Sequence, residues 1–296
     1  MIDIFFTVER MIDERWLRQD THRYYRQTAH RWVEDMQLHD LSEITTDLVV
    51  QWRKKVADRG CSASTLNTYH RGMRAILNFA REKRLVETNP FEEVKLIHIG
   101  RRIKKTLPPS LLDDAIRILS NWGDDGYFWC LVVKVLYYTG IRRQQLPGIK
   151  WGDLNEVDGA LSIRASTSKT DREWFVPLDD DLLQELLEFR VMTNNRLHRE
   201  VKHDEQMFRV QLWNNRYAGN ELSRSQVSGF FRRLSEKQGV AISSHRFRHT
   251  FATHLVRHDL KSAQEILGHT NIRTTMDYVY PELDQMKELV KKLPRL

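Results

Sequence analysis

The sequence is poor in cysteine and has no long hydrophobic run. Its 296 residues include only two cysteines, Cys61 and Cys130, which we interpret as packing residues in helices rather than as a disulfide pair. No stretch approaches the roughly 20 apolar residues that a membrane-spanning helix needs, and the apolar N-terminal patch is interrupted too early for a signal peptide. We therefore expect a cytoplasmic protein without a disulfide framework.

Motifs of nucleotide-dependent and metal-dependent enzymes are also missing. The sequence has no G-x-x-x-x-G-K-[ST] loop, no H-E-x-x-H and no acidic pair at two-metal spacing. Two i, i+4 histidine pairs, His245 with His249 and His254 with His258, are alternative metal ligands, but no cysteine or suitably spaced carboxylate joins them. We predict no metal and no cofactor, and we assign His249 and His254 to packing and local hydrogen bonds.

The charge excess is mild. Lys and Arg number 47 against 40 Asp and Glu, a net charge of +7, and hydrophobic residues make up 41% of the chain. A basic balance suits a polyanionic partner, although solubility alone explains it equally well. The length and the apolar content are sufficient for two domains with real cores.

Apolar residues at helical spacing predict an all-helical first domain over residues 1–100, with many basic side chains on its outer faces. Asn89-Pro90 is expected to end the last long helix of this domain. The predicted helices cover residues 23–38, the segment from a Thr45 or Thr46 cap to Gly60, and residues 64–85.

Helical periodicity lapses after residue 96, where four basic residues and two prolines gather. We predict a basic linker over residues 101–108. A basic connector suits a protein that closes around a nucleic-acid backbone, because each cation near a phosphate releases counterions, but a solvated linker is an equal alternative. The candidate DNA contacts are Arg101, Arg102, Lys104 and Lys105 in the linker and Arg71 and Arg74 in the third helix.

Residues 109–296 are expected to form a second domain, in which the spacing of apolar residues changes from helical to alternating and back. Alternating apolar residues at 160–166 and 173–178, with SKTDR between them, predict a β-hairpin. The fold class is therefore mainly α with a small antiparallel β-sheet. The helices predicted here cover residues 110–122, 127–139, 180–194, 223–239, 244–257, 262–267, 274–280 and a terminal segment from 282.

Four segments of this domain hold groups suited to phosphoryl transfer on DNA. They are TGIR, the hairpin tip STSKTDR, SHRFRHT at a helix start, and LGHTNIRTTMDY. Two guanidinium groups can neutralise the charge that grows on a phosphodiester under attack, and removing one should cost roughly 3 to 4 kcal/mol of barrier. A tyrosine needs such help as a nucleophile, and a lysine can protonate the leaving 5′-hydroxyl. Each residue alone would be unremarkable, so the combination carries the prediction.

In order and approximate spacing, these motifs resemble the phage integrase family of tyrosine recombinases over nearly the whole chain. The resemblance implies a core-binding domain and a catalytic domain arranged as a C-shaped clamp. It implies a site-specific recombinase that cuts through a 3′-phosphotyrosine, with double-stranded DNA sites and a homo-tetramer as partners. It makes Arg142 and Arg248 the paired arginines, Lys169 the hairpin lysine, His245 and His269 the histidine positions, and Tyr278 the nucleophile.

The C-terminal tail carries apolar residues at helical spacing that must be buried somewhere. In this family such a tail commonly docks on a neighbouring protomer, and packing on its own domain is the alternative. The apolar positions are Leu283, Met286, Leu289, Val290 and Leu293.

The sequence departs from the family pattern at Gln145, where an acidic residue is usual; a carboxylate there would orient and charge-stabilise a histidine. Pro147 should limit its helix to a single turn. Tyr280 competes with Tyr278, but positions two apart on a helix face different directions, and the nine residues from His269 favour Tyr278. The alternatives are a DNA-binding regulator on the same fold, which Gln145 invites, and a type IB topoisomerase.

Overall fold

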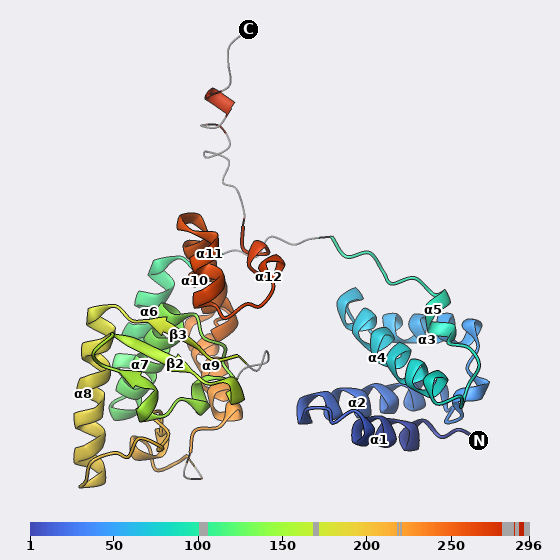
Figure 1. Ribbon diagram of the computed structural model, residues 1–296, viewed down its shortest axis with the longest axis horizontal. Helices are drawn as coiled ribbons and strands as arrows, with labels where there is room; N and C mark the ends of the chain where they lie inside the picture. The colour runs from blue at the N-terminus through green and yellow to red at the C-terminus, as the bar shows by residue number, and fades with distance from the viewer. Residues whose placement is uncertain are drawn as a thin grey trace. The chain divides into compact units, whose positions relative to one another are not determined.

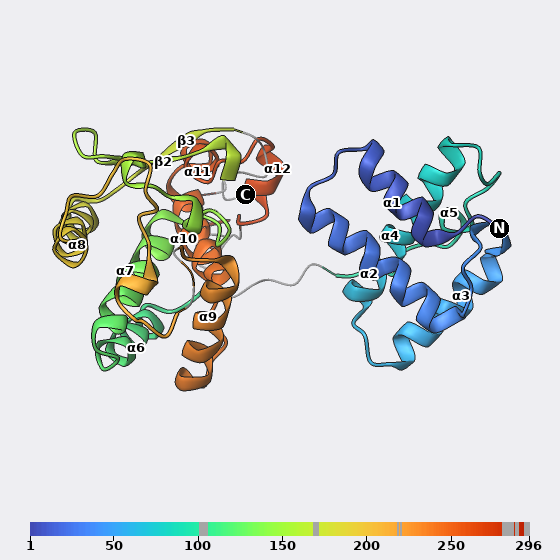
Figure 2. The ribbon, with the colours of Figure 1, turned by 90° about the horizontal axis from the view of Figure 1, so that it is seen from below.

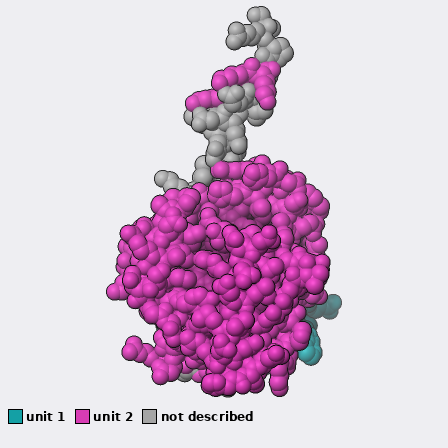
Figure 3. All heavy atoms as spheres, turned by 90° about the vertical axis from the view of Figure 1, so that its left-hand side faces the viewer, with its two compact units in different colours: residues 1–102 teal, residues 103–296 magenta. Residues whose placement is uncertain are grey.

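The computed structural model describes residues 1–100, 106–167, 172–217, 219, 221–279, 287 and 290–292. The chain divides into two compact units, Met1–Arg102 and Ile103–Leu296, which Figure 3 colours separately. No helix within the described ranges is long and apolar enough to cross a membrane. Several predicted residues fall outside these ranges: the basic linker positions Arg101, Arg102, Lys104 and Lys105, the hairpin residue Lys169, Tyr280, and most of the tail.

The first unit is a helical bundle (Figure 1). Thr45, one of the two predicted caps, caps α3 (Thr46–Asp58) by accepting a hydrogen bond from the Leu48 amide at 3.3 Å. Trp32, Trp52 and Phe91 meet edge to face at the centre of the core, where all three rings are buried. The helices are α1 Ile4–Glu14, α2 Gln19–Met36, α3 Thr46–Asp58, α4 Ala63–Glu82 and the short α5 Pro90–Glu93.

Three details of this unit differ from the sequence prediction. Helix α1 was not predicted; Asp3 starts it by accepting from the Phe6 amide at 2.9 Å. Asn89-Pro90 ends no helix but begins α5, because the Asn89 side chain caps Phe91 and proline suits the first helical turn. Cys61 lies in the loop between α3 and α4 rather than in a helix, and both cysteines are free.

The second unit packs helices around a small sheet, which confirms the predicted fold class. Strand β2 (Ala160–Ile163) pairs antiparallel with β3 (Trp174–Pro177) and with β1 (Leu154–Asn155), which was not predicted. Leu161, Ile163, Trp174 and Val176 are buried on one face. The helices are α6 Pro109–Ser120, α7 Asp124–Thr139, α8 Asp180–Leu197, α9 Arg224–Gln238, α10 Ser244–His258, α11 Leu260–Ile266 and α12 Ile272–Met276.

Helix α7 is the centre of this unit. It is apolar on most sides, and it contacts α6, α8 and α10. Helix α10 contacts α7 and α11, and α11 in turn contacts β3 and α12 (Figure 2). Segments far apart in the sequence therefore converge where α7, α10, α11 and α12 meet.

The helix predicted over 274–280 is shorter than expected. Helix α12 ends at Met276, so Tyr278 lies in the following turn, where its amide donates to the Thr275 carbonyl at 3.0 Å. Tyr278 is therefore not in a helix, and the prediction that helical geometry separates it from Tyr280 is wrong for Tyr278. Pro147 lies within a single 3-10 turn, Leu146–Gly148, in keeping with the predicted short helix.

Candidate active site

Arg248 lies at the centre of the candidate site. It is on α10, is 4% exposed, and donates to three acceptors from three segments. Nη1 donates to the Gly140 carbonyl at 2.6 Å, while Nη2 donates to the Leu267 carbonyl at 2.8 Å and lies 2.8 Å from His269 Nε2. One guanidinium thus holds together the end of α7, the end of α11 and the His269 loop.

Gly140 explains the threonine-glycine pair that ends α7. Its φ of +60° is left-handed, and a Cβ there would lie 2.2 Å from the Phe251 ring. Only glycine meets both conditions without strain. The tight turn points the Gly140 carbonyl at Arg248 and leads directly into Arg142.

Arg142 follows this turn and is half-buried. Its amide donates to Gln145 Oε1 at 2.7 Å, and Gln145 is completely buried. The Gln145 side chain thus binds the Arg142 backbone, whereas the carboxylate that is usual at this position in the family was expected to orient a histidine. Arg142 Nη1 and Gln145 Nε2 are buried donors without a hydrogen-bond partner among the described residues. Such donors are costly unless an acceptor arrives.

His269 is held on all sides. Gln264 brackets its backbone, since the His269 amide donates to the Gln264 carbonyl and Gln264 Nε2 donates to the His269 carbonyl, both at 3.0 Å. Its ring contacts Arg248 through Nε2, and Nδ1 lies 2.9 Å from Thr275 Oγ1. The ring therefore has a fixed orientation.

The hairpin is attached to this loop. Trp174 on β3 donates from Nε1 to the Ile266 carbonyl at 3.0 Å, and Arg172 pairs with Glu265 at 2.6 Å. Gly268, with a φ of +62°, packs so closely that a Cβ would lie 2.5 Å from the Trp174 ring. The strand that follows Lys169 in sequence is thus anchored to the segment that carries His269.

Tyr278 is half-buried between two histidine rings. The His269 ring is parallel to it, with an interplanar angle of 9° and centroids 6.1 Å apart. The His249 ring meets it edge-on at 5.3 Å. We predicted that His249 serves packing and local hydrogen bonds, and we did not predict Thr275 as a site residue. His249 lies four residues after His245 and Thr275 three residues before Tyr278, and this spacing alone was too weak a signal to single them out.

Burial and positive charge dominate the electrostatics. Burial lowers the pKa of Arg142, and the Tyr278 side chain opposes the shift. Burial and then the Arg142 charge lower the pKa of Arg248, again opposed by Tyr278. Burial, Arg248 and Arg142 lower the pKa of His269 to about 3. Both arginines stay charged in any case, so the site presents two dehydrated cations beside a phenol and a neutral imidazole.

Three other predicted residues, His245, Arg71 and Arg74, are exposed. His245 is exposed in the first turn of α10, one turn before Arg248. Arg71 and Arg74 are exposed on α4 in the first unit, and Arg74 lies 3.8 Å from Glu92. Lys169 lies outside the described residues, so its position relative to the cluster stays a prediction.

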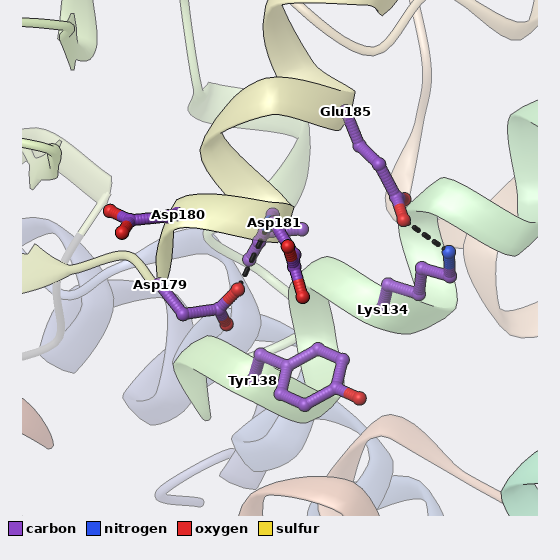
Figure 4. Close-up of a pocket in the computed structure, with 7 residues that line it drawn as sticks. Lys134, Tyr138, Asp179, Asp180, Asp181 and Glu185 are labelled. Carbon is purple, nitrogen blue, oxygen red and sulfur yellow. Dashed lines mark hydrogen bonds and ion pairs between the residues drawn. The ribbon is translucent and has the colours of Figure 1, made fainter.

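A separate hollow lies between α7 and the start of α8 (Figure 4). Lys134 pairs with Glu185 at one side of it, and Tyr138 lies below. Its lining contains none of the predicted site residues, and its carboxylates would repel a phosphate. The Arg142 and Arg248 cluster therefore remains the candidate site. The acidic lining residues are Asp179, Asp180, Asp181 and Glu185.

Comparisons with known proteins agree on one family. The family model described as "Phage integrase family" matches residues 113–283. The putative tyrosine recombinase XerC of Pseudomonas aeruginosa is 31% identical over 269 residues, which cover 82% of this chain and 60% of that protein. The chain thus spans about 60% of the length of that relative.

Two solved structures share the fold. The Tn1549 transposon integrase in complex with a circular intermediate DNA has a TM-score of 0.73 at 18% identity and covers 99% of this chain and 100% of that one. A lambda integrase tetramer bound to a Holliday junction has a TM-score of 0.71 at 19% identity, with 95% and 78% covered. At these identities the likeness establishes the fold alone.

Proposed function

The chain belongs to the phage integrase family of tyrosine recombinases, and on that premise we propose that it is a site-specific DNA recombinase with Tyr278 as its nucleophile. One observation carries this proposal: Tyr278 and Arg248 both lie against the same His269 ring, and both Arg142 and Arg248 interact electrostatically with Tyr278. A nucleophile and two phosphate-binding cations are thus gathered at one point of the second unit.

The reaction follows from these groups. Tyr278 Oη attacks the phosphorus, a bond forms between them, and the bond to the 5′-oxygen breaks. Arg142 and Arg248 offset the charge that develops on the non-bridging oxygens. The buried donor Nη1 of Arg142 then finds its acceptor in the phosphate. The tyrosine proton leaves to solvent or a basic group, and Lys169 supplies a proton to the departing 5′-hydroxyl.

The 3′-phosphotyrosine ester keeps the energy of the broken bond. A 5′-hydroxyl from another strand can therefore reverse the step, without nucleotide or metal, and rejoin DNA in a new arrangement. His269 holds Arg248, and His245 at the helix start is a second group for proton transfer or phosphate contact. We assign Arg71 and Arg74 on α4, and the linker residues Arg101, Arg102, Lys104 and Lys105, to contacts with DNA phosphates.

Strand exchange between two duplexes needs four cleavages, and a homo-tetramer on DNA supplies four tyrosines. The lambda integrase tetramer on a Holliday junction supports this assembly. Exchange of the apolar C-terminal tail between protomers would link the four copies. The products are the integration, excision or resolution of mobile or replicon DNA in the cytoplasm.

Covalent trapping tests the proposal. The protein is incubated with a nicked recombination site from which the cleaved fragment diffuses away, and the protein–DNA band is followed on a denaturing gel. The wild-type protein and Tyr280→Phe should form the band, and Tyr278→Phe should not. A band that survives in Tyr278→Phe and disappears in Tyr280→Phe would show that Tyr280 is the nucleophile. If the wild type forms no band at any cognate site, the protein is instead a DNA-binding regulator that does not cleave DNA.

A further inference from the structure

Thr275 connects the His269 ring to the turn that presents Tyr278. It is completely buried on α12, with Oγ1 at 2.9 Å from His269 Nδ1 and its carbonyl at 3.0 Å from the Tyr278 amide. We propose that Thr275 is a positioning residue that holds His269 in the Nδ1-protonated tautomer, with an unprotonated Nε2 facing Arg248, and that fixes the Tyr278 turn.

The tautomer follows from the donors and acceptors around the ring. A guanidinium carries only N–H donors and no acceptor, so Arg248 Nη2 at 2.8 Å requires a lone pair on His269 Nε2. A neutral imidazole has one protonated and one unprotonated nitrogen. The proton must therefore be on Nδ1, and it is donated to Thr275 Oγ1.

The same surroundings keep the ring neutral. Burial and the charges of Arg248 and Arg142 lower the pKa of His269 to about 3. A protonated ring would also turn an Nε2–H donor against an Arg248 donor. Among the described residues, Arg248 on α10, Thr275 on α12 and Tyr278 in the turn after α12 contact this ring, and the charge of Arg142 also acts on it.

Thr275 also acts on the nucleophile. Helix α12 has only five residues, and backbone hydrogen bonds hold the turn at its end. The amides of Asp277 and Tyr278 both donate to the Thr275 carbonyl, and the Val279 amide donates to the Met276 carbonyl. The hydroxyl of Thr275 thus fixes the His269 ring and its carbonyl fixes the Tyr278 backbone, so that the two rings stay parallel.

The consequence for the reaction rests on the proposed function. Arg248 donates to the Leu267 carbonyl, to the Gly140 carbonyl and to His269 Nε2, and these three acceptors set its orientation. If Thr275 no longer accepts from Nδ1, the imidazole can change tautomer and present a donor to Arg248. Both the phosphate-binding cation and the phenol would then move from their positions.

The tautomer is tested on the DNA-free protein by ¹⁵N NMR of the histidine side chains, with His269→Gln to assign the resonance. In the wild type we expect a protonated Nδ1 and an unprotonated Nε2 at neutral pH. Thr275→Val, which removes the hydroxyl at nearly constant volume, should lose this preference, and Thr275→Ser should keep it. A wild-type His269 that is protonated at Nε2, or charged, overturns the proposal, and this spectrum decides even where Thr275→Val does not fold.

Single-turnover cleavage gives the second readout. Thr275→Val should lower the cleavage rate roughly 10- to 100-fold, the effect of a small misplacement of reacting groups, and leave DNA affinity unchanged. Thr275→Ser should restore most of the rate. Equal rates for Thr275→Val and the wild type would overturn the positioning role. If the wild type itself forms no covalent adduct, the proposed function fails while the tautomer is still decided by NMR.

Discussion

The ring of Tyr278 lies parallel to the ring of His269, with an interplanar angle of 9° and a centroid separation of 6.1 Å. Nine residues separate the two in sequence, and α12 lies between them. Because His269 Nε2 also contacts Arg248, this stacking brings the phenol into the arginine cluster of its own unit. The arrangement needs no second copy of the chain to bring phenol and cations together.

Gln145 should be required for the position of Arg142. Gln145→Leu removes the acceptor for the Arg142 amide and leaves a buried donor without a partner, which costs about 1 to 3 kcal/mol. We expect a smaller net loss of stability in urea unfolding, because the change also removes the unpartnered donor Gln145 Nε2, and a cleavage rate lower by roughly 10- to 100-fold. Gln145→Glu keeps an acceptor oxygen and should retain more activity than Gln145→Leu. Equal activity in both variants would show that the Arg142 hydrogen bond is unimportant.

Gly268 should tolerate no side chain. Gly268→Ala combines a left-handed φ of +62° with a Cβ at 2.5 Å from the Trp174 ring. The two effects together should destabilise the fold by about 2 to 4 kcal/mol. Gly239→Ala is the matched control, because its φ is +68° but a Cβ there meets nothing within 4 Å. The free energy of unfolding of both variants, measured in denaturant, separates the cost of steric overlap from that of backbone strain. If both variants lost the same free energy of unfolding, the close packing of Gly268 against Trp174 would be contradicted.

His70 should make the first unit sensitive to acid. Burial lowers its pKa to about 4, below the unfolded value of about 6.5, while its Nε2 lies 2.9 Å from the Phe91 carbonyl. As the pH falls, His70 therefore becomes protonated in the unfolded state before it does in the folded state. Its contribution to the free energy of unfolding is complete above about pH 6.5 and is lost as the pH falls toward 4. Linkage puts the loss of folding free energy at about 2 kcal/mol at pH 5.

The measurement is urea unfolding at pH 7 and pH 5 for the wild type and His70→Gln. Glutamine does not titrate and can still donate to the Phe91 carbonyl, so the difference between the two pH values should shrink in the variant. An identical pH effect in both proteins would assign the acid sensitivity to other groups, such as His269, whose pKa is lowered in the same direction.

Arg71 should contribute to DNA affinity through charge alone, if the proposed function holds. It is exposed on α4, and loss of one phosphate contact should reduce the slope of log K against log salt by about 1. Arg117→Ala in the second unit is the control, because Arg117 is exposed on α6 and pairs with Asp114. Titrations of cognate and unrelated duplexes at several salt concentrations measure both slopes. An unchanged slope for Arg71→Ala would exclude α4 from the phosphate contacts.

The sequence by itself determined the fold class and most of the helices. Apolar periodicity is a local property, and it located α3, α4 and α7 because each buries one face or most of its sides. Motif order identified the family and named Arg142, Arg248, His269 and Tyr278, since side-chain chemistry can be read without coordinates.

Only the tertiary structure decided what these residues do to one another. The contact of His249 with Tyr278 and the packing of Gly268 against Trp174 join segments that are remote in sequence. The contacts of Gln145 with the Arg142 amide and of Thr275 with His269 are closer in sequence, but they depend on how each turn folds. The end of α12 at Met276 was equally hidden, because apolar periodicity does not show where tertiary contacts end a helix. Hydrogen bonds of this kind are set by packing, and packing is a property of the whole folded unit.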